Sequence, residues 1–298
     1  MKTIKTKSPT RVDLAGGTLD LWPLYNFLGG ASTINVAIDI YTEVELTPFV
    51  DSTRIELISE DLKYQREFDN LEQCLQDKDR HLDLLKAQLS YWHPQKGFSL
   101  RTRSQSPVGG GLGGSSSLTI SLLKAFSIFC EKPFASVHQM VQVAHHLEAQ
   151  VLNTPTGTQD YYPAASGGIN VLHYSANGIE QEVLDRETSE LAKHFLLVYT
   201  GKAHHSGLNN FEVLTHAVQK HPQTMQALHD LKKIAEATFH ACHDHQWQEL
   251  PKLFQQEFKA RVALAKAFSS PEIEKLAEVS LQAGAEAVKI CGAGGGGC

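Results

Sequence analysis

Ser-Pro-Val-Gly-Gly-Gly-Leu-Gly-Gly-Ser-Ser-Ser, from Ser106 to Ser117, is the stretch that decides the fold of this chain. From Leu118 to Cys130 an apolar pattern at helical spacing follows, without Gly or Pro. Glycines have no Cβ atom to obstruct a ligand, so their N–H groups can turn toward an anion at the positive end of the helix. The stretch therefore predicts a phosphate-binding loop for a nucleotide, made of Gly109, Gly110, Gly111, Leu112, Gly113 and Gly114 and followed by Ser115 and Ser116.

Other glycine-rich loops fit this stretch less well. A Walker A loop ends in Gly-Lys-Ser or Gly-Lys-Thr, and the first Lys after the glycines is Lys124. A dinucleotide-binding fingerprint needs an acidic residue about 20 residues on, but Glu131, at that distance from Gly111, lies outside any expected strand. A flexible glycine and serine linker seldom runs straight into an amphipathic helix. A serine beside bound phosphates could instead reach Mg²⁺, which prefers hard oxygen ligands.

The composition is that of an ordinary globular enzyme. The 298 residues suffice for about two domains, and 42% of them are hydrophobic. The net charge of −6 offers no basic surface for nucleic acid. Nothing approaches the ~20 apolar residues of a membrane span, and Met1–Pro9 lacks the apolar core of a secretory signal. We therefore expect a cytoplasmic protein with no nucleic-acid partner and no membrane partner.

Hydrophobic periodicity places the loop between a strand and a helix. Residues 34–50 are rich in β-branched side chains and predict a strand, with 54–59 as its partner. Residues 71–92 read as helical segments, and 98–103 as the short strand that leads into the glycine loop. A second helix is predicted to begin after Ser136, where Gln139 completes a capping box.

Two acidic residues follow in this second helix and in the segment after it. Glu148 lies at the edge of the apolar stripe of the helix, where spacing alone slightly favours the protein surface over a site. Asp160 lies in a turn-rich passage before a predicted strand at 169–174, and catalytic groups often occupy such connections. An Asp in a turn is usually a helix cap. Beside a phosphate loop and a helical Glu, however, it becomes a candidate base for an alcohol.

Two further segments combine a predicted strand with a glycine loop. Residues 9–20 read Pro-Thr-Arg-Val-Asp-Leu-Ala-Gly-Gly-Thr-Leu-Asp, which runs from a strand through a glycine turn to Asp20. Residues 288–298 read Val-Lys-Ile-Cys-Gly-Ala-Gly-Gly-Gly-Gly-Cys, again a predicted strand before glycines. Three such loops in one chain are hard to explain as ordinary turns.

In this order and spacing, the three segments resemble the motifs of the GHMP kinases, the family of galactokinase, homoserine kinase, mevalonate kinase and phosphomevalonate kinase. The resemblance spans essentially the whole chain. The first motif, with Gly16-Gly17 followed by Asp20 and Pro23, is most similar to the sugar-kinase branch that contains heptose 7-phosphate kinase and fucokinase.

The resemblance implies roles for individual residues. It assigns the Mg²⁺-ligating hydroxyl to Ser115, with Ser116 as the alternative, and a second Mg²⁺ ligand to Glu148. Asp160 corresponds to the catalytic Asp and Arg11 to a basic residue near the transferred phosphoryl group. The positions implied to contact the substrate are Gly17, Thr18, Asp20 and Gly294.

The fold that this resemblance implies is α+β, in two domains with the active site between them. Residues 1–193 are expected to resemble the second domain of ribosomal protein S5, and 194–298 to form a sandwich of helices on a sheet. Family members continue beyond the third motif for at least one strand and a helix, so a truncated second domain is one expectation for a chain that stops at Cys298.

The activity that the resemblance implies is transfer of the γ-phosphoryl group of ATP, with Mg²⁺, to a hydroxyl of a sugar or sugar phosphate. Two alternatives stay open, namely a kinase of a small non-sugar alcohol such as mevalonate and a regulatory nucleotide-binding module without catalysis. A homodimer is a further open expectation.

Overall fold

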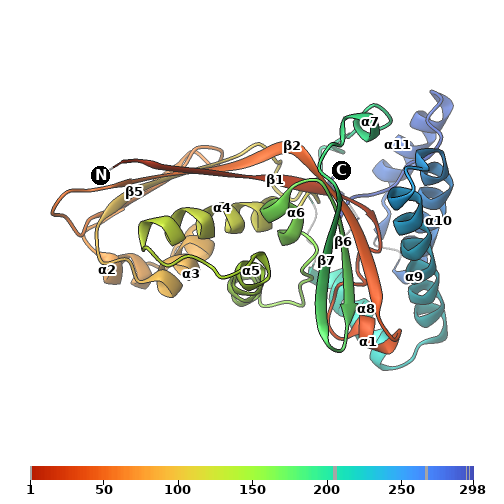
Figure 1. Ribbon diagram of the computed structural model, residues 1–298, viewed down its shortest axis with the longest axis horizontal. Helices are drawn as coiled ribbons and strands as arrows, with labels where there is room; N and C mark the ends of the chain where they lie inside the picture. The colour runs from red at the N-terminus through yellow and green to blue at the C-terminus, as the bar shows by residue number, and fades with distance from the viewer. Residues whose placement is uncertain (1, 204–206, 266–267, 293, 295) are drawn as a thin grey trace.

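One seven-stranded mixed sheet organises the molecule (Figure 1). The computed structural model describes residues 2–203, 207–265, 268–292, 294 and 296–298. The strands are β1 (Ile4–Ala15), β2 (Ala31–Pro48), β3 (Ile55–Ser59), β4 (Tyr64–Phe68), β5 (Phe98–Ser104), β6 (Ile169–Ser175) and β7 (Gly178–Asp185). They lie in the order β4-β3-β5-β2-β6-β7, and β1 pairs with β2 off this path. The neighbours are antiparallel except β3 and β5, which are parallel.

The helices fall into two groups along the chain. The first group is α1 (Leu24–Phe27), α2 (Leu71–Gln76), η1 (Arg80–Leu82), α3 (Asp83–Trp92), α4 (Gly114–Phe129), α5 (Val137–Leu152), α6 (Tyr161–Ser166) and α7 (Ser189–Ala192). The second group is α8 (Gly207–Val218), α9 (Pro222–His243), η2 (Trp247–Glu249), α10 (Leu250–Leu264) and α11 (Pro271–Gln282). None of these helices combines the length and the apolar character needed to cross a bilayer.

The long strand β2 joins the two halves of the molecule. Its first residues pair with β6, where Ala31 lies opposite Tyr174, and its last residues pair with β5, where Thr42 lies opposite Ser104. Strand β1 pairs with it over most of its length, with a register shift between Asp13 and Ala15. The predicted strand at 34–50 is therefore confirmed, and it forms the central element of the sheet.

Two hydrophobic cores lie on opposite faces of the sheet. Side chains alternate between the faces of a strand, and β6 follows this rule. Ile169 and Val171 belong to the core beneath α9 and α10, whereas Leu172 and Tyr174 belong to the core that α3, α4 and α5 cover. Figure 1 shows α9, α10 and α11 gathered at one end of the molecule, beyond β6 and β7.

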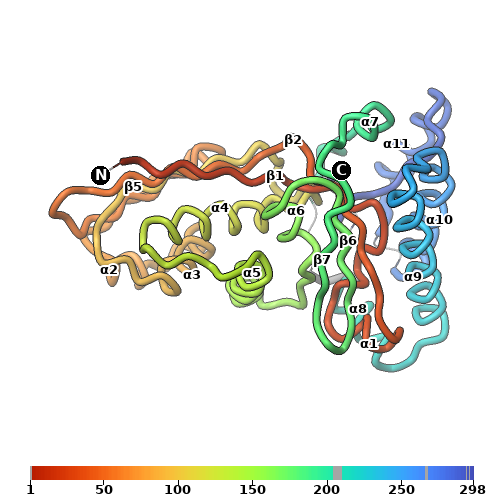
Figure 2. The backbone as a smooth tube through the Cα atoms, viewed as in Figure 1, coloured from red at the N-terminus to blue at the C-terminus, as the bar shows by residue number. Residues whose placement is uncertain are grey.

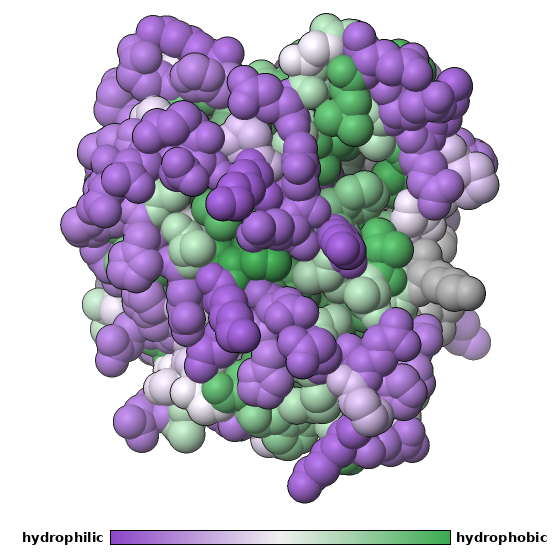
Figure 3. All heavy atoms as spheres, turned by 90° about the vertical axis from the view of Figure 1, so that its right-hand side faces the viewer, coloured by the Kyte–Doolittle hydropathy of each residue, from purple (hydrophilic) through white to green (hydrophobic). Residues whose placement is uncertain are grey.

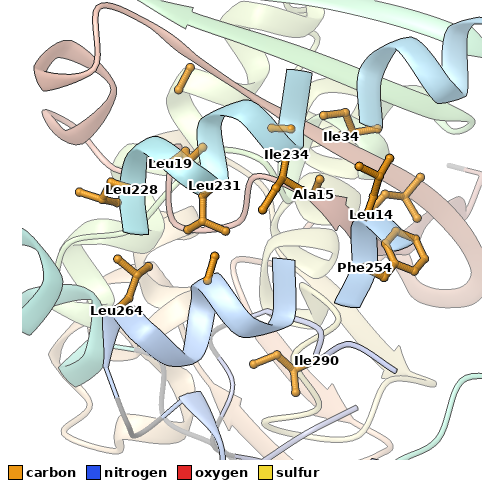
Figure 4. Packing of buried hydrophobic residues seen from close by; sticks show 14 of the residues in the cluster. Leu14, Ala15, Leu19, Ile34, Leu228, Leu231, Ile234, Phe254, Leu264 and Ile290 are labelled. Carbon is orange, nitrogen blue, oxygen red and sulfur yellow. The ribbon is translucent and has the colours of Figure 1, made fainter. Parts of the chain in front are cut away.

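Helices α9 and α10 pack on the end of β1 that leads into the first glycine turn. Figure 4 shows Leu14 and Ala15 of β1 facing Leu231 and Ile234 of α9, with α10 alongside. The C-terminal residues return to the middle of the molecule beside β1 and β2, while the N-terminus lies at the far end of the sheet (Figure 2). This return brings the third glycine motif next to the second.

The expected sheet of the C-terminal part is wrong for the residues that the structure describes. No described residue after Lys193 belongs to a strand, and 288–290, predicted as a strand, are irregular. The helices of this part pack instead on the sheet formed by the first half of the chain. The end of the molecule that carries α9, α10 and α11 has apolar residues near its centre and polar residues around them (Figure 3). Exposed apolar side chains in this part of the chain include Leu196, Val279 and Leu281.

One pairing prediction is also wrong, although the strand itself exists. Residues 54–59 contain β3, but β3 pairs with β4 and β5 and not with β2. The reason is that β5 is inserted between them, with Phe98 opposite both Pro48 of β2 and Ile55 of β3. The strand before the glycine loop and the capping of α5 by Ser136, which accepts from Gln139 N, are confirmed.

Candidate active site

A cavity of about 650 Å³ lies where the three glycine motifs meet. The phosphate loop lines one wall together with the first turn of α4. Thr18 and Asp20 of the first motif, Gly292 and Gly294 of the third, and residues 154–160 complete it. A volume of this size suits small-molecule ligands.

The phosphate loop ends in a left-handed turn that only glycine adopts without strain. Gly113 has φ +69° and precedes α4, which begins at Gly114 and so takes Ser115 and Ser116 into its first turn. The first N–H groups of a helix have no partner within it and point toward the loop. A Cβ atom on Gly113 would lie 3.0 Å from Asp160 Oδ2. Glycine at this position thus allows the acid to approach the phosphate loop closely.

Arg11 ties Asp160 to the phosphate loop. Its Nε donates to Asp160 Oδ1 at 2.8 Å, its Nη2 lies 2.6 Å from the same oxygen, and its Nη1 donates to the carbonyl of Gly111 at 2.7 Å. Burial alone would lower the pKa of Arg11, but the charges of Asp160 and Asp13 outweigh burial and raise it. Arg11 therefore remains a buried cation.

Asp160 occupies the N-cap position of α6, yet its side chain does not cap the helix. About a quarter of the side chain, 24%, is exposed, and it lines the cavity. The interpretation of this residue as an ordinary helix cap therefore fails. Its carboxylate is held by Arg11 and faces the space in which a ligand would bind.

Glu148 is buried, which corrects the expectation from helix spacing that it lies at the surface. Its side chain is oriented from two directions, because Oε2 accepts from Ser116 Oγ at 2.9 Å and from the Tyr161 hydroxyl at 2.6 Å. Burial raises its pKa, while hydrogen bonds from Ser115, Tyr161 and Ser116 oppose the shift. These hydroxyl and carboxylate oxygens beside the phosphate loop are a donor set that suits Mg²⁺.

Asp20 lines the same cavity and lies against the segment 157–159, which precedes Asp160. It is 5% exposed, and its Oδ2 accepts from Gln159 N at 3.1 Å. Burial and the nearby charge of Asp160 raise its pKa from 3.8 to about 6. A Cβ atom on Gly157 would overlap this carboxylate, so residue 157 must be glycine for Asp20 to keep its place.

The third motif closes the cavity against the phosphate loop. Cys298 N donates to the carbonyl of Gly110 at 2.9 Å, and a Cβ atom on Gly292 would lie 2.8 Å from the carbonyl of Gly111. Gly294 lines the cavity. The backbones of the second and third motifs are thus in direct contact, although 181 residue positions separate Gly111 from Gly292.

The structure brings nearly all of the predicted positions to one cavity. Those that line it are Arg11, Thr18, Asp20, Gly109, Gly110, Gly111, Gly113, Gly114, Ser115, Ser116, Glu148, Asp160 and Gly294. Two others stand behind its wall. Leu112 is buried, and its carbonyl accepts from Arg11 N at 3.1 Å. Gly17 lies against the guanidinium of Arg261.

Two residues of the site were not foreseen from the sequence. Tyr161 follows Asp160 directly and binds Glu148, and a tyrosine pair after a candidate base was the only signal that could have found it. Arg261 of α10 also lines the cavity and is 1% exposed. Its place among the apolar positions of an amphipathic helix gave the one indication of burial.

Comparisons with known proteins match both parts of the chain to domains of one family. The model of the GHMP kinase N-terminal domain matches residues 79–168, and that of the C-terminal domain matches 227–298. The D-glycero-alpha-D-manno-heptose 7-phosphate kinase of Campylobacter jejuni is 27% identical, with 100% of this chain and 88% of that protein covered. The L-fucokinase/L-fucose-1-P guanylyltransferase of Bacteroides fragilis is 24% identical, with 98% of this chain but 33% of that protein covered.

A solved structure shares the whole fold. The D-glycero-D-manno-heptose 1-phosphate kinase of Bacteroides thetaiotaomicron superimposes with a TM-score of 0.77 at 23% identity, and the match covers 98% of this chain and 86% of the other. The resemblance expected from the three motifs is confirmed. Because the two domain models together match more than half of its residues, the chain belongs to the GHMP kinase family.

Proposed function

We propose that this protein is an ATP-dependent kinase that phosphorylates a hydroxyl group of a sugar or sugar phosphate. The observation that carries the proposal is the convergence of the phosphate loop, the Arg11 and Asp160 pair and Glu148 on one cavity. The two relatives above are named for activities on a heptose 7-phosphate and on L-fucose, which supports a sugar acceptor.

The nucleotide binds along the phosphate loop in this proposal. Backbone N–H groups of the phosphate loop and of the first turn of α4 donate to the β- and γ-phosphate oxygens, except that of Gly110, which donates to the Pro107 carbonyl at 2.9 Å. Leu62, Leu84 and Val108 line the same cavity and offer apolar surface to the base. Ser115, with Ser116 as the alternative hydroxyl, and Glu148 would hold Mg²⁺, which would supply positive charge to offset that of the phosphates.

Asp160 is the proposed general base. It accepts the proton of the acceptor hydroxyl as that oxygen forms its bond to the γ-phosphorus, and the bond from the γ-phosphorus to the bridging oxygen breaks to release ADP. Arg11 holds the base in position through Oδ1 and at the same time holds the carbonyl of Gly111. One side chain thus fixes the base relative to the phosphate loop, which is the positional requirement of an in-line transfer.

Asp20 is the proposed recognition group for the acceptor, and Gly17, Thr18 and Gly294 are further proposed substrate positions. A carboxylate can accept from two adjacent hydroxyls, as a sugar would present. Among the described residues, the cations that line the cavity are Arg11 and Arg261, and each already faces carboxylates of the protein. A carboxylate-bearing acceptor such as mevalonate would therefore find no unshared cation among the described residues of the cavity, which supports a polyol.

The two parts of the chain contribute differently to this site. We assign the phosphate loop, the Mg²⁺ ligands and the base to residues 1–193, and the wall formed by Arg261 and the third motif to residues 194–298. The described residues of the second part that line the cavity are Asn210, Arg261, Cys291, Gly292, Gly294 and Gly296. Expressing 1–193 alone and measuring its ATP affinity would test this division.

A panel assay tests the proposed function. The protein is incubated with Mg-ATP and heptose phosphates, L-fucose, galactose or mevalonate, and ADP release is followed. We expect ADP release above the acceptor-free rate with at least one sugar or sugar phosphate and not with mevalonate. Release with mevalonate alone would favour the non-sugar kinase. ATP binding without release on any acceptor would favour a regulatory module.

A further inference from the structure

Four charged side chains are buried together between β1, α10 and the segment that leads into the third glycine motif. They are Asp13, Glu257, Arg261 and Lys289, called here the charge cluster, and the exposure of their side chains is 0%, 0%, 1% and 6%. Arg261 Nη1 lies 3.8 Å from Asp13 Oδ2 and from Glu257 Oε1. Lys289 Nζ lies 3.2 Å from Asp13 Oδ2 and 3.7 Å from Glu257 Oε2.

The surroundings of the charge cluster are apolar. Lys289 Nζ lies 5.8 Å from the centre of the Phe254 ring, and the guanidinium carbon of Arg261 lies 4.8 Å from that of Phe268. Figure 4 shows Leu14, Phe254 and Ile290, which come from the same three segments of the chain. Two acids and two bases leave the charge cluster neutral overall, so it offers no net charge to a ligand in the neighbouring cavity.

Stability alone does not explain this arrangement. A buried ion pair is often no more stabilising than apolar residues of the same volume, because both ions lose their hydration. Within the described residues, both carboxylate oxygens of Glu257 and two guanidinium nitrogens of Arg261 lack hydrogen-bond partners. Each such group costs free energy when it is buried. The charge cluster therefore needs an explanation in what it binds.

The charge cluster grips the backbone of the third motif. Asp13 Oδ1 accepts from Gly292 N at 3.0 Å, and Arg261 Nη2 donates to the carbonyl of Gly292. Lys289 Nζ, besides its ion pairs, donates to the carbonyl of Asp13 at 2.5 Å. Both polar groups of Gly292 are thus fixed by side chains of other elements, in a segment whose described residues belong to no strand.

From Gly292 the contacts continue to the reacting groups. Gly292 packs on Gly111, whose carbonyl accepts from Arg11, and Arg11 holds Asp160. On the other side, a Cβ atom on Gly17 would overlap Arg261 Nη1, so the first motif rests directly on the guanidinium. Asp13 and Arg11 are two residues apart on β1, where alternate residues share a face. One face of β1 thus carries both Asp13, which binds Gly292, and Arg11, which binds Asp160.

We propose that the charge cluster positions the catalytic loops, by fixing Gly292 between Gly111 and the first motif and so setting the place of Asp160 relative to the nucleotide. Its members are positioning residues, which act through Gly292 and Gly17. The kinetic part of this inference rests on the proposed kinase activity. The structural part, that the ion pairs hold the third motif in place, does not.

Balanced and unbalanced removal of charge separates positioning from stability. Asp13→Asn keeps an oxygen for Gly292 N and loses the charge, and Lys289→Met keeps the length of the side chain. Each single variant leaves a buried charge without its partner, which is strongly destabilising, whereas the double variant is charge-balanced again. Lys5→Met with Glu45→Gln, an exposed pair across β1 and β2, is the matched control.

Hydrogen exchange and kinetics are measured on the same proteins. We expect the double variant to recover most of the wild-type Tm, yet to exchange about tenfold faster in residues 288–298 and to show a kcat about tenfold below wild type. Its KM for ATP stays within about threefold of wild type. The control pair changes neither exchange nor kcat. A double variant that recovers both wild-type exchange and wild-type kcat would show a purely structural cluster and overturn the proposal.

Two further measurements keep the inference testable. If the double variant does not fold, Glu257→Gln removes one charge without touching Gly292, and wild-type exchange in 288–298 of that variant would refute the positioning role. If the wild-type protein phosphorylates no acceptor, the proposed function fails. The exchange comparison still decides whether the charge cluster orders the third motif.

Discussion

Replacing Tyr161 with Phe removes one hydroxyl from the buried wall of the site and leaves the ring in place. The hydroxyl donates to Glu148 Oε2 at 2.6 Å, and Tyr161 is 1% exposed. Burial and the charge of Glu148 raise the pKa of Tyr161 well above its ordinary value, so the proton stays on the phenol at any working pH. Of the two hydroxyls that donate to Glu148 Oε2, only that of Ser116 then remains.

The magnitude follows from the type of bond that is lost. A hydrogen bond to a charged group contributes about 1.5–3 kcal/mol, and groups that orient a metal ligand typically change metal affinity by about 10- to 100-fold. We expect Tyr161→Phe to raise the Mg²⁺ concentration for half-maximal activity by about tenfold or more. Mn²⁺ binding, followed by electron paramagnetic resonance in the presence of ATP, should weaken in parallel.

The neighbouring tyrosine provides the control. Tyr162 is equally buried, but its hydroxyl lies 2.8 Å from His138 Nδ1 and not beside Glu148. Tyr162→Phe should therefore affect Tm without changing the metal requirement. If Tyr161→Phe folds and its Mg²⁺ requirement stays within about twofold of wild type, Tyr161 does not orient the metal ligand.

Three further predictions concern the acceptor side of the cavity. Asp20→Ala should raise the acceptor KM or lower kcat/KM by about 10- to 100-fold, because about 1.4–2.8 kcal/mol of hydrogen bonding to the acceptor is lost. The KM for ATP should stay unchanged. A loss of ATP affinity instead would place Asp20 on the nucleotide side. Because the pKa of Asp20 is raised to about 6, kcat/KM for the acceptor should fall as pH drops below about 6 in wild type and not in Asp20→Asn, and equal profiles would remove Asp20 from recognition. Gly157→Ala should reproduce the acceptor defect of Asp20→Ala, since its Cβ would overlap the carboxylate, and an unchanged acceptor KM would contradict that geometry.

The raised pKa of Asp20 also makes the stability of the protein depend on pH. Its native pKa lies above its ordinary value of 3.8, so the native state binds the proton more tightly than the unfolded chain does. The contribution of Asp20 to stability is therefore largest below pH ~4 and is lost as pH rises through about 6. The form that suits acceptor binding is thus the form that burial disfavours, as is common at functional sites.

Much of the site could be predicted from local sequence patterns. The glycine runs predicted three loops, and the apolar stripes on either side predicted the strand and helix that flank each of the first two. Asp160 was recognisable because a turn with Pro155 and Gly157 placed it beyond the end of a helix. These signals depend on neighbours within a few residues, which is the range over which turn and capping chemistry operates.

The errors arose where distant segments compete for the same place. Helix spacing predicted that Glu148 is exposed, because it reflects only residues of the same helix. The hydrogen bonds that allow Glu148 to be buried come from Ser116 and Tyr161, which belong to other elements. The pairing of β3 was predicted wrongly because β5 lies between β2 and β3 and pairs with both. Residues 288–290 have a strand-like sequence, but Lys289 is held by Asp13 and Glu257 in an irregular segment.

The most direct test of the central claim is the activity of Asp160→Asn beside its affinity for ATP. Asn keeps an oxygen for Arg11 but cannot take up the proton of the acceptor hydroxyl. With the acceptor that the panel identifies, we predict a kcat lower by about 10²- to 10⁴-fold and a Kd for Mg-ATP within about threefold of wild type. A variant whose kcat stays within a few-fold of wild type would contradict the account, because the carboxylate held by Arg11 would then not be the base.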